Sequence, residues 1–159
     1  MTQSTFTLNR FNGREVFAIA NAEISVEKND ETLLLNFTAG GQLPALEKTC
    51  EDTAEFEEKP YIELIVVLQD AAKTFSFKDF VGRKFEIQEA MDPWLGDFVA
   101  NFYYFKGQHA HSCFIEVLSQ INPTHYRVKI TAKVADVNWY DGSKPETSIV
   151  IEADFKVME

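Results

Sequence analysis

The chain has 159 residues, of which 45% are hydrophobic, and 25 acidic against 15 basic residues give it a formal net charge of −10. This length suits one domain with a substantial core, so we expect residues 1–159 to form a single domain. The acidic balance disfavours nucleic acids and anionic membrane surfaces as partners, because both are polyanions.

The few cysteines and the short apolar runs favour a soluble protein in a reducing compartment. Cys50 and Cys113 are too few for a disulfide framework, and free thiols suit a reducing environment. The first residues lack the charged and apolar regions of a signal peptide. The longest apolar run, residues 64–68, is far shorter than the ~20 residues of a membrane-spanning helix. We therefore expect a soluble, cytoplasmic protein with no membrane partner.

The first 30 residues predict a hairpin. Residues 5–11 and 14–28 are rich in strand-forming types and flank Asn12-Gly13, the pair that most readily adopts positive φ at both turn positions. In the second arm, alternate residues share one face of a long predicted strand. The row of alanines among them would let another element approach this face closely; the residues are Val16, Ala18, Ala20, Ala22, Ile24 and Val26.

The middle of the chain predicts strands around one helical or irregular segment. Residues 31–41 place Leu33, Leu35 and Phe37 on one face of a strand. Residues 42–59 are the best candidate for a helix or long loop, with Pro44 near its start. Residues 61–70 predict a strand buried on both faces. We expect a pair of strands at residues 73–80 and 83–90. We expect a short helical turn at residues 91–97.

The last third shows the clearest strand pattern. Residues 125–137 and 147–157 each alternate apolar and charged positions, which predicts one dry and one wet face. If these strands pair side by side, a basic row opposes an acidic row. With eight to ten strands and at most one or two short helices, the sequence predicts an all-β, mainly antiparallel domain, either a β-sandwich or a barrel.

Residues 106–117, KGQHAHSCFIEV, contain the pattern most typical of chemistry. On one strand His109, His111 and Cys113 would line the same side about 6.6 Å apart. Such a mixed nitrogen and sulfur set, with His125 as a further ligand, suits zinc or another transition metal. In the structural alternative the histidines lie at the rim of a core-facing row and Cys113 is a small buried hydrophobe.

The stretch His109-Ala110-His111 with Glu116 following resembles the first motif of the cupin family, whose members are jelly rolls of strands. The resemblance covers these eight residues only. Gly107 lies closer to the histidines than the family's glycine, and Glu116 falls on the opposite strand face. It implies a cupin-like metal protein or enzyme that uses His109, His111 and one of Cys113, Glu116 or His125.

Two further segments suggest contact with a partner protein. Residues 47–58 are strongly acidic, and the loop of residues 136–147 carries two adjacent aromatic residues. The structural alternatives are a solvated face and a cap on the end of the core. In the functional interpretation both segments contact a basic protein, through Glu51, Asp52, Glu55, Phe56, Glu57, Glu58, Trp139, Tyr140 and Asp141.

The function indicated by these features is binding without catalysis. The chain has no Gly-x-Ser-x-Gly elbow and no glycine-rich phosphate loop, so no catalytic residue is nominated. We expect a cofactor-free acidic interaction module, by analogy of class and charge with immunity-type proteins that neutralise a basic partner. The alternatives are the metal protein described above and a β-barrel whose phenylalanine-rich interior encloses an apolar small ligand.

Overall fold

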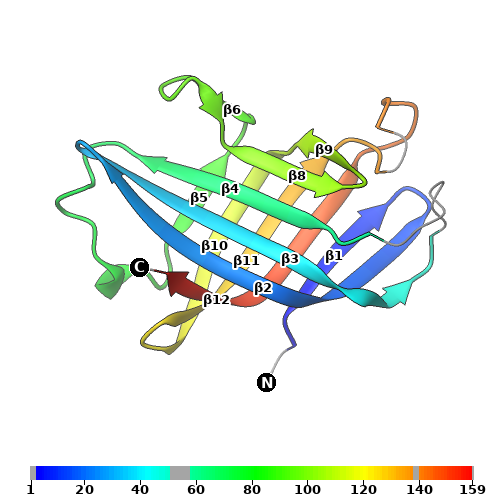
Figure 1. Ribbon diagram of the computed structural model, residues 1–159, viewed down its shortest axis with the longest axis horizontal. Helices are drawn as coiled ribbons and strands as arrows, with labels where there is room; N and C mark the ends of the chain where they lie inside the picture. The colour runs from blue at the N-terminus through cyan, green and yellow to red at the C-terminus, as the bar shows by residue number, and fades with distance from the viewer. Residues whose placement is uncertain (1–2, 51–57, 138–139, 159) are drawn as a thin grey trace.

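The computed structural model describes residues 3–50, 58–137 and 140–158, in which β-strands are the dominant regular structure (Figure 1). One sheet contains β1 (Thr5–Arg10), β2 (Gly13–Asn29), β3 (Thr32–Lys48), β4 (Tyr61–Leu68), β5 (Lys84–Ile87), β8 (Ala100–Tyr104), β9 (Lys106–His109), β10 (His111–Asn122), β11 (His125–Val134) and β12 (Thr147–Met158). β6 (Met91–Asp92) and β7 (Asp97–Phe98) form a separate ribbon, and η1 (Phe77–Asp79) is a 3₁₀ turn. The predicted all-β, mainly antiparallel class is confirmed, with one parallel pairing between β12 and β2. In the described residues no helix has the length and apolar character required to cross a bilayer.

The large sheet curls back on itself. Its hydrogen-bonded order is β5-β10-β11-β12-β1-β2-β3-β4-β8-β9. Only Ala110 separates β9 from β10, and its N–H donates to the Ala100 carbonyl at 3.0 Å. One continuous stretch therefore pairs with β8 at one end and β11 at the other, which closes a barrel in which β2–β4 cross in front of β10–β12 (Figure 1). Neighbouring strands are mostly consecutive in sequence, unlike the jelly roll that the cupin resemblance implies.

The predicted N-terminal hairpin is present, with its turn one residue earlier. Arg10 pairs with Gly13, so Phe11 and Asn12 are the turn residues. Gly13 opens β2 with φ 147°, and a Cβ there would lie 2.9 Å from backbone atoms of Thr49 and Cys50. The glycine is required by this close approach of the chain after β3, in addition to its backbone angle.

The single row of alanines predicted along β2 is wrong. Register irregularities between residues 16 and 18 and between residues 19 and 21 interrupt the pairing with β3. They place Phe17 in the core and leave Ala20 exposed, before Ala22 and Ile24 turn inward again. The first irregularity leaves about three extra residues on β3 and the second about one extra residue on β2, and an odd number of extra residues reverses the faces that follow it.

The helix or long loop predicted for residues 42–59 is also wrong in its first part. β3 continues to Lys48, where it pairs with Glu15 of β2, and the Leu43-Pro44 peptide within it is cis. Pairing with β2 provides hydrogen bonds that favour the strand, and the residue spacing of this segment alone gives no sign of them. Residues 51–57 lie outside the described residues.

Two of the three predictions for residues 61–97 need correction. β4 is buried on one face only, since Tyr61 is 40% exposed while Ile62 and Leu64 are fully buried. The pair predicted from residues 73–80 and 83–90 does not form, because residues 73–80 contain η1 and β5 pairs with β10. The short helical turn predicted around residues 91–97 is present within the β6–β7 ribbon, where the Gly96 N–H donates to the Asp92 carbonyl at 2.8 Å and the Asp92 carboxylate accepts the Trp94 N–H at 2.9 Å.

The alternation predicted for the last two strands is confirmed. β11 and β12 are antiparallel neighbours, with Arg127 opposite Asp154 and Lys129 opposite Glu152. The Arg127 guanidinium donates to the carboxylates of Glu152 at 3.0 Å and Asp154 at 3.2 Å. The basic and acidic rows therefore meet on the outer face, and the apolar residues of both strands face inward.

Aromatic side chains fill the barrel interior. Phe37 packs edge-on against Phe155 with ring centroids 6.1 Å apart, and Phe6 lies 6.4 Å from Phe102. All four rings are at most 1% exposed. These four rings occupy part of the interior that the apolar-ligand hypothesis assigns to a guest.

A buried polar cluster lies beside this apolar core. Glu15 of β2 is fully buried and accepts hydrogen bonds from the Arg10 guanidinium at 2.5 Å and the Tyr104 hydroxyl at 2.6 Å. The Lys48 ammonium lies 3.4 Å from the same carboxylate. These contacts connect β1, β2, β3 and β8, and the Tyr140 hydroxyl adds a hydrogen bond to the Tyr104 carbonyl at 2.6 Å.

Candidate functional site

The two histidines of the predicted metal motif lie on different strands. His109 ends β9, where its ring stacks on Phe98 with centroids 3.8 Å apart and planes 7° from parallel. His111 begins β10, and its Nε2 lies 2.5 Å from the Glu146 carboxylate. Each imidazole thus has its own set of neighbours.

The chain between the histidines and Cys113 breaks the expected alternation. Ser112 has φ 50°, and the pairing of β10 with β11 is irregular between His111 and Phe114. Cys113 then points into the core with no exposed surface. Burial raises the pKa of the Cys113 thiol to about 12, so the thiolate that a metal requires is strongly disfavoured.

The other two predicted ligands lie elsewhere. The Glu116 carboxylate is 3.3 Å from the Lys84 ammonium. His125 follows the far end of β10, about 35 Å from His111 along the strand, and its Nδ1 is 2.9 Å from the Asn122 side-chain oxygen. The structure does not bring the five candidates together, and the described residues contain no group of three or more His, Cys, Asp or Glu placed to hold a metal.

The predicted partner-binding residues are only partly within the described chain. Six of them, Glu51, Asp52, Glu55, Phe56, Glu57 and Trp139, lie outside it. Glu58 is half-buried, and its carboxylate accepts the Lys59 N–H at 3.2 Å. Tyr140 is half-buried and bonds inward to Tyr104, which suits a cap on the core. Asp141 is exposed, and its hydrogen bonds with Ser143 lower the pKa of its carboxyl group.

The structure reveals an exposed aromatic surface that the sequence patterns did not single out. Tyr61 of β4 pairs with Tyr103 of β8, and these side chains are 40% and 44% exposed. Two positions along, Glu63 pairs with Asn101, which in turn pairs with His109 of β9. We call these five residues, Tyr61, Glu63, Asn101, Tyr103 and His109, the tyrosine face.

The tyrosine face surrounds a shallow depression of about 400 Å³, which Gly107 and Gln108 also line. Gly40 lies opposite Tyr61 in β3, and a Cβ at that position would lie 3.6 Å from the Tyr61 ring. The Phe98 ring, 40% exposed and stacked on His109, extends the aromatic surface beyond the depression.

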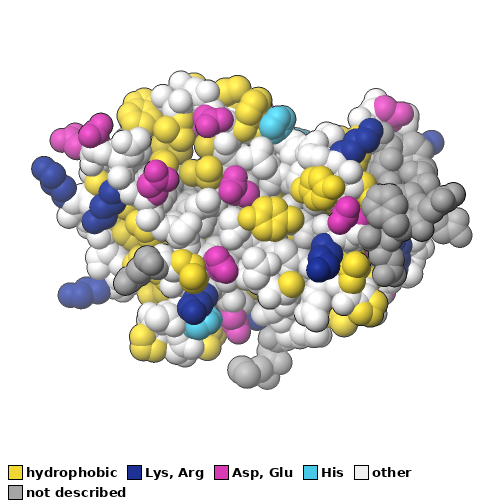
Figure 2. All heavy atoms as spheres, in the orientation of Figure 1, with side chains coloured by type: hydrophobic (Ala, Val, Ile, Leu, Met, Phe, Trp, Pro, Cys, Tyr) yellow, Lys and Arg dark blue, Asp and Glu magenta, His cyan; other side chains and the backbone are white. Residues whose placement is uncertain are grey.

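Negative charge lies next to these rings. Burial raises the pKa of the Tyr61 hydroxyl, and the contact with the Thr38 side chain lowers it. The carboxylates of Glu63 and Glu23 add to the increase because they oppose a second negative charge nearby. Figure 2 shows acidic side chains distributed among hydrophobic ones across the middle of this face of the molecule. The arrangement offers aromatic rings and carboxylates together, which are the groups that hold a guanidinium or ammonium group.

Part of this face was accessible to sequence reasoning. Successive residues of a strand point to opposite faces, and Ile62 and Leu64 are fully buried. If only one face of β4 is buried, Tyr61 and Glu63 must lie on the outer face. No local signal predicts that β4 pairs with β8, however, because 31 residues lie between these two strands in the sequence. The meeting of Tyr61 and Tyr103 is therefore a tertiary result.

The fold and this face define an antiparallel β-barrel with an exposed aromatic and acidic surface. No protein-family model matches the chain, and searches of curated proteins and of solved structures found no match either.

Proposed function

We propose that the protein is a non-enzymatic interaction module that binds a basic protein partner through the tyrosine face. The observation that carries the proposal is the pairing of two exposed tyrosines next to Glu63 in a chain of net charge −10. Exposed aromatic clusters are enriched where proteins bind one another, and opposite charge accelerates and orients the encounter.

The mechanism is the capture of a cationic side chain. An arginine of the partner inserts between the Tyr61 and Tyr103 rings, and Glu63 accepts hydrogen bonds from its guanidinium group. The Glu63 carboxylate is already oriented by the Asn36 amide, which donates to it at 3.4 Å. Bound in this way, the module covers a basic surface of its partner, as immunity-type proteins do, and the setting is the cytoplasm.

The acidic segment predicted from the sequence supports the same partner. Residues 51–58 are separated from Tyr61 only by Lys59 and Pro60, so the carboxylates of this segment belong to the connection that leads into β4 and the tyrosine face. Reversing the charges of Glu55, Glu57 and Glu58 is expected to weaken binding and to reduce its salt dependence.

A titration with a hexaarginine peptide tests the proposal, with binding followed by NMR chemical-shift changes. We expect shifts centred on Tyr61 and Tyr103, and a dissociation constant about tenfold weaker in Tyr61→Ala. Glu63→Gln is expected to reduce the dependence of binding on salt.

The chain provides a matched control pair. Phe114 is 48% exposed and lies opposite Glu86, so these residues reproduce an exposed aromatic–carboxylate pair on β10 and β5. Phe114→Ala and Glu86→Gln should leave peptide binding unchanged. The proposal is overturned if hexaarginine does not bind, or if the control pair matters as much as the tyrosine face.

A further inference from the structure

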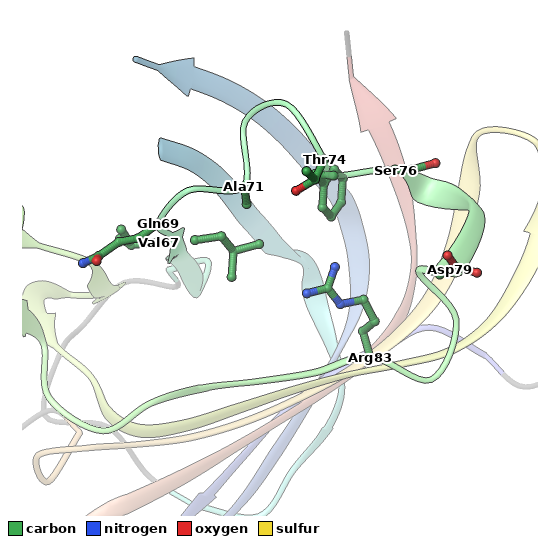
Figure 3. A pocket seen from close by; sticks show the side chains of 9 residues that line it. Val67, Gln69, Ala71, Thr74, Ser76, Asp79 and Arg83 are labelled. Atoms are coloured by element: carbon green, nitrogen blue, oxygen red, sulfur yellow. The ribbon is translucent and has the colours of Figure 1, made fainter. Parts of the chain in front are cut away.

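A separate pocket lies at the opposite end of β4 from Tyr61. Residues 69–80 follow β4 and, together with the chain before β5, line an open pocket of about 570 Å³. Figure 3 shows the side chains of Val67, Thr74 and Arg83 around this space. A volume of this size is typical of small-molecule sites.

Arg83 distinguishes this pocket from the rest of the surface. The chain has four arginines, and three of them lie within ion-pair distance of a carboxylate: Arg10 at Glu15, Arg14 at Glu47, and Arg127 at Glu152 and Asp154. Within the described residues Arg83 has no such carboxylate partner, although acidic residues outnumber basic ones by 25 to 15.

Two aromatic rings fix the position of the Arg83 guanidinium. It lies over Phe75 at 5.6 Å and over Phe85 at 5.2 Å from the ring centroids. Figure 3 shows the side chain extending into the pocket from the chain that leads into β5. A cation–π contact does not use up the N–H donors of a guanidinium group, which can still make a bidentate contact with an oxyanion.

The remainder of the pocket combines apolar side chains with polar ones, among them Gln69 and Ser76. Val67, Leu68 and Phe75 provide hydrocarbon surface, and Thr74 supplies a hydroxyl group. The pocket also contains Asp79, whose negative charge disfavours a doubly charged ligand such as phosphate. A singly charged group with an apolar tail therefore fits this lining best.

We propose that this cavity, the Arg83 pocket, binds a small amphipathic carboxylate. The carboxylate accepts two hydrogen bonds from the guanidinium edge, and the hydrocarbon tail packs against Val67, Leu68 and Phe75. This inference is independent of the tyrosine face, because the two sites lie at opposite ends of β4 and use different residues.

Titration with octanoate, followed by calorimetry and NMR, tests the proposal. We expect saturable binding with shifts at Val67, Leu68 and Phe75, and a dissociation constant about tenfold weaker in Arg83→Gln. Arg83→Lys keeps the charge but loses the planar fork, so it should weaken binding to an intermediate degree. Lys84→Gln is the matched control, because the Lys84 side chain is 75% exposed and pairs with Glu116 outside the pocket.

Two further probes separate the charge from the tail. Octan-1-ol has the same tail without the charge, and inorganic phosphate has charge without a tail. Both should bind at least about tenfold more weakly than octanoate. Equal binding of octanol reduces the site to an apolar hollow, and equal binding of phosphate reduces it to a general anion site. Either result overturns the proposal, as does absent octanoate binding or an equal loss in Lys84→Gln. Thermal melting of the Arg83 variants confirms that they are folded.

Discussion

Cys113 shows how the environment of one residue alters its chemistry. The side chain lies among apolar neighbours in the barrel interior, with no exposed surface, and burial raises the pKa of its thiol from 9.0 to about 12. A thiolate is a poor fit in such surroundings because it loses its hydration. At neutral pH Cys113 therefore acts as a small hydrophobic residue, whatever its place in the histidine-containing motif suggests.

This raised pKa predicts a pH dependence of stability. Below pH 9 the Cys113 thiol is neutral in both the folded and the unfolded chain, so its ionisation does not reduce the free energy of unfolding. Between pH 9 and 12 only the unfolded chain ionises, and the free energy of unfolding should fall by about 1.4 kcal/mol per pH unit from this group. Urea unfolding on both sides of pH 9 measures the effect.

Cys113→Ala separates the effect of the thiol on stability from that of other groups, since tyrosines and lysines also titrate in this range. The variant should be less stable than the native chain below pH 9, because of the lost side-chain volume, but should lose less stability as the pH rises. Identical pH profiles for the two proteins would show that the thiol ionises as readily in the folded barrel as in the unfolded chain.

At the scale of elements, strand pairing overrides local patterns in this protein. β3 extends through Pro44 to Lys48 because β2 is long enough to pair with it, although the local pattern favours a helix or loop. The same dependence on partners divides residues 106–117 into β9 and β10. Pairing with β8 ends at His109 and pairing with β11 begins at His111, so the two histidines are separated by the closure of the barrel.

The start of β2 gives a prediction at this scale. Gly13→Ala should lower the free energy of unfolding by about 2 kcal/mol, because φ 147° is strained for alanine and the new Cβ would lie 2.9 Å from the backbone of Thr49 and Cys50. Chemical denaturation measures the loss. Gly107→Ala is the matched control: no atom lies within 4 Å of the position a Cβ would take in this strand residue. A comparable loss in both variants would contradict the proposed role of the close approach.

The whole molecule combines strong negative charge with two separated surface features. The tyrosine face lies at one end of β4 and the Arg83 pocket at the other, on a barrel with an aromatic interior. The tyrosine face is held by strands whose opposite faces are buried, whereas the Arg83 pocket is formed mainly by the connection between β4 and β5.

The net charge gives a prediction for the molecule as a whole. Duplex DNA should not be retarded by the protein in a gel even at low salt, because a chain of net charge −10 cannot replace the counterions of the phosphates. Hexaarginine binding in the same buffer should instead strengthen as salt is lowered. Retardation of DNA would require a local basic surface that dominates over the average charge.

The sequence by itself determined the all-β class, the N-terminal hairpin and the two terminal strands β11 and β12. These features depend on short-range alternation, in which one face of each strand is apolar and the other is wet, as with Val128 and Lys129. A periodicity of two residues is visible in the chain wherever one face is buried and no bulge intervenes.

Only the tertiary structure decided the closure of the barrel, the extension of β3, and the meeting of residues that are distant in sequence. Tyr61 and Tyr103 become neighbours through the pairing of β4 with β8, and Arg83 reaches Phe75 across η1. His109 and Cys113, in contrast, are close in sequence and diverge because Ser112 has positive φ and the register shifts. Local patterns specify which face of a strand is apolar, whereas the choice of pairing partners and bulges depends on how the whole chain buries that face.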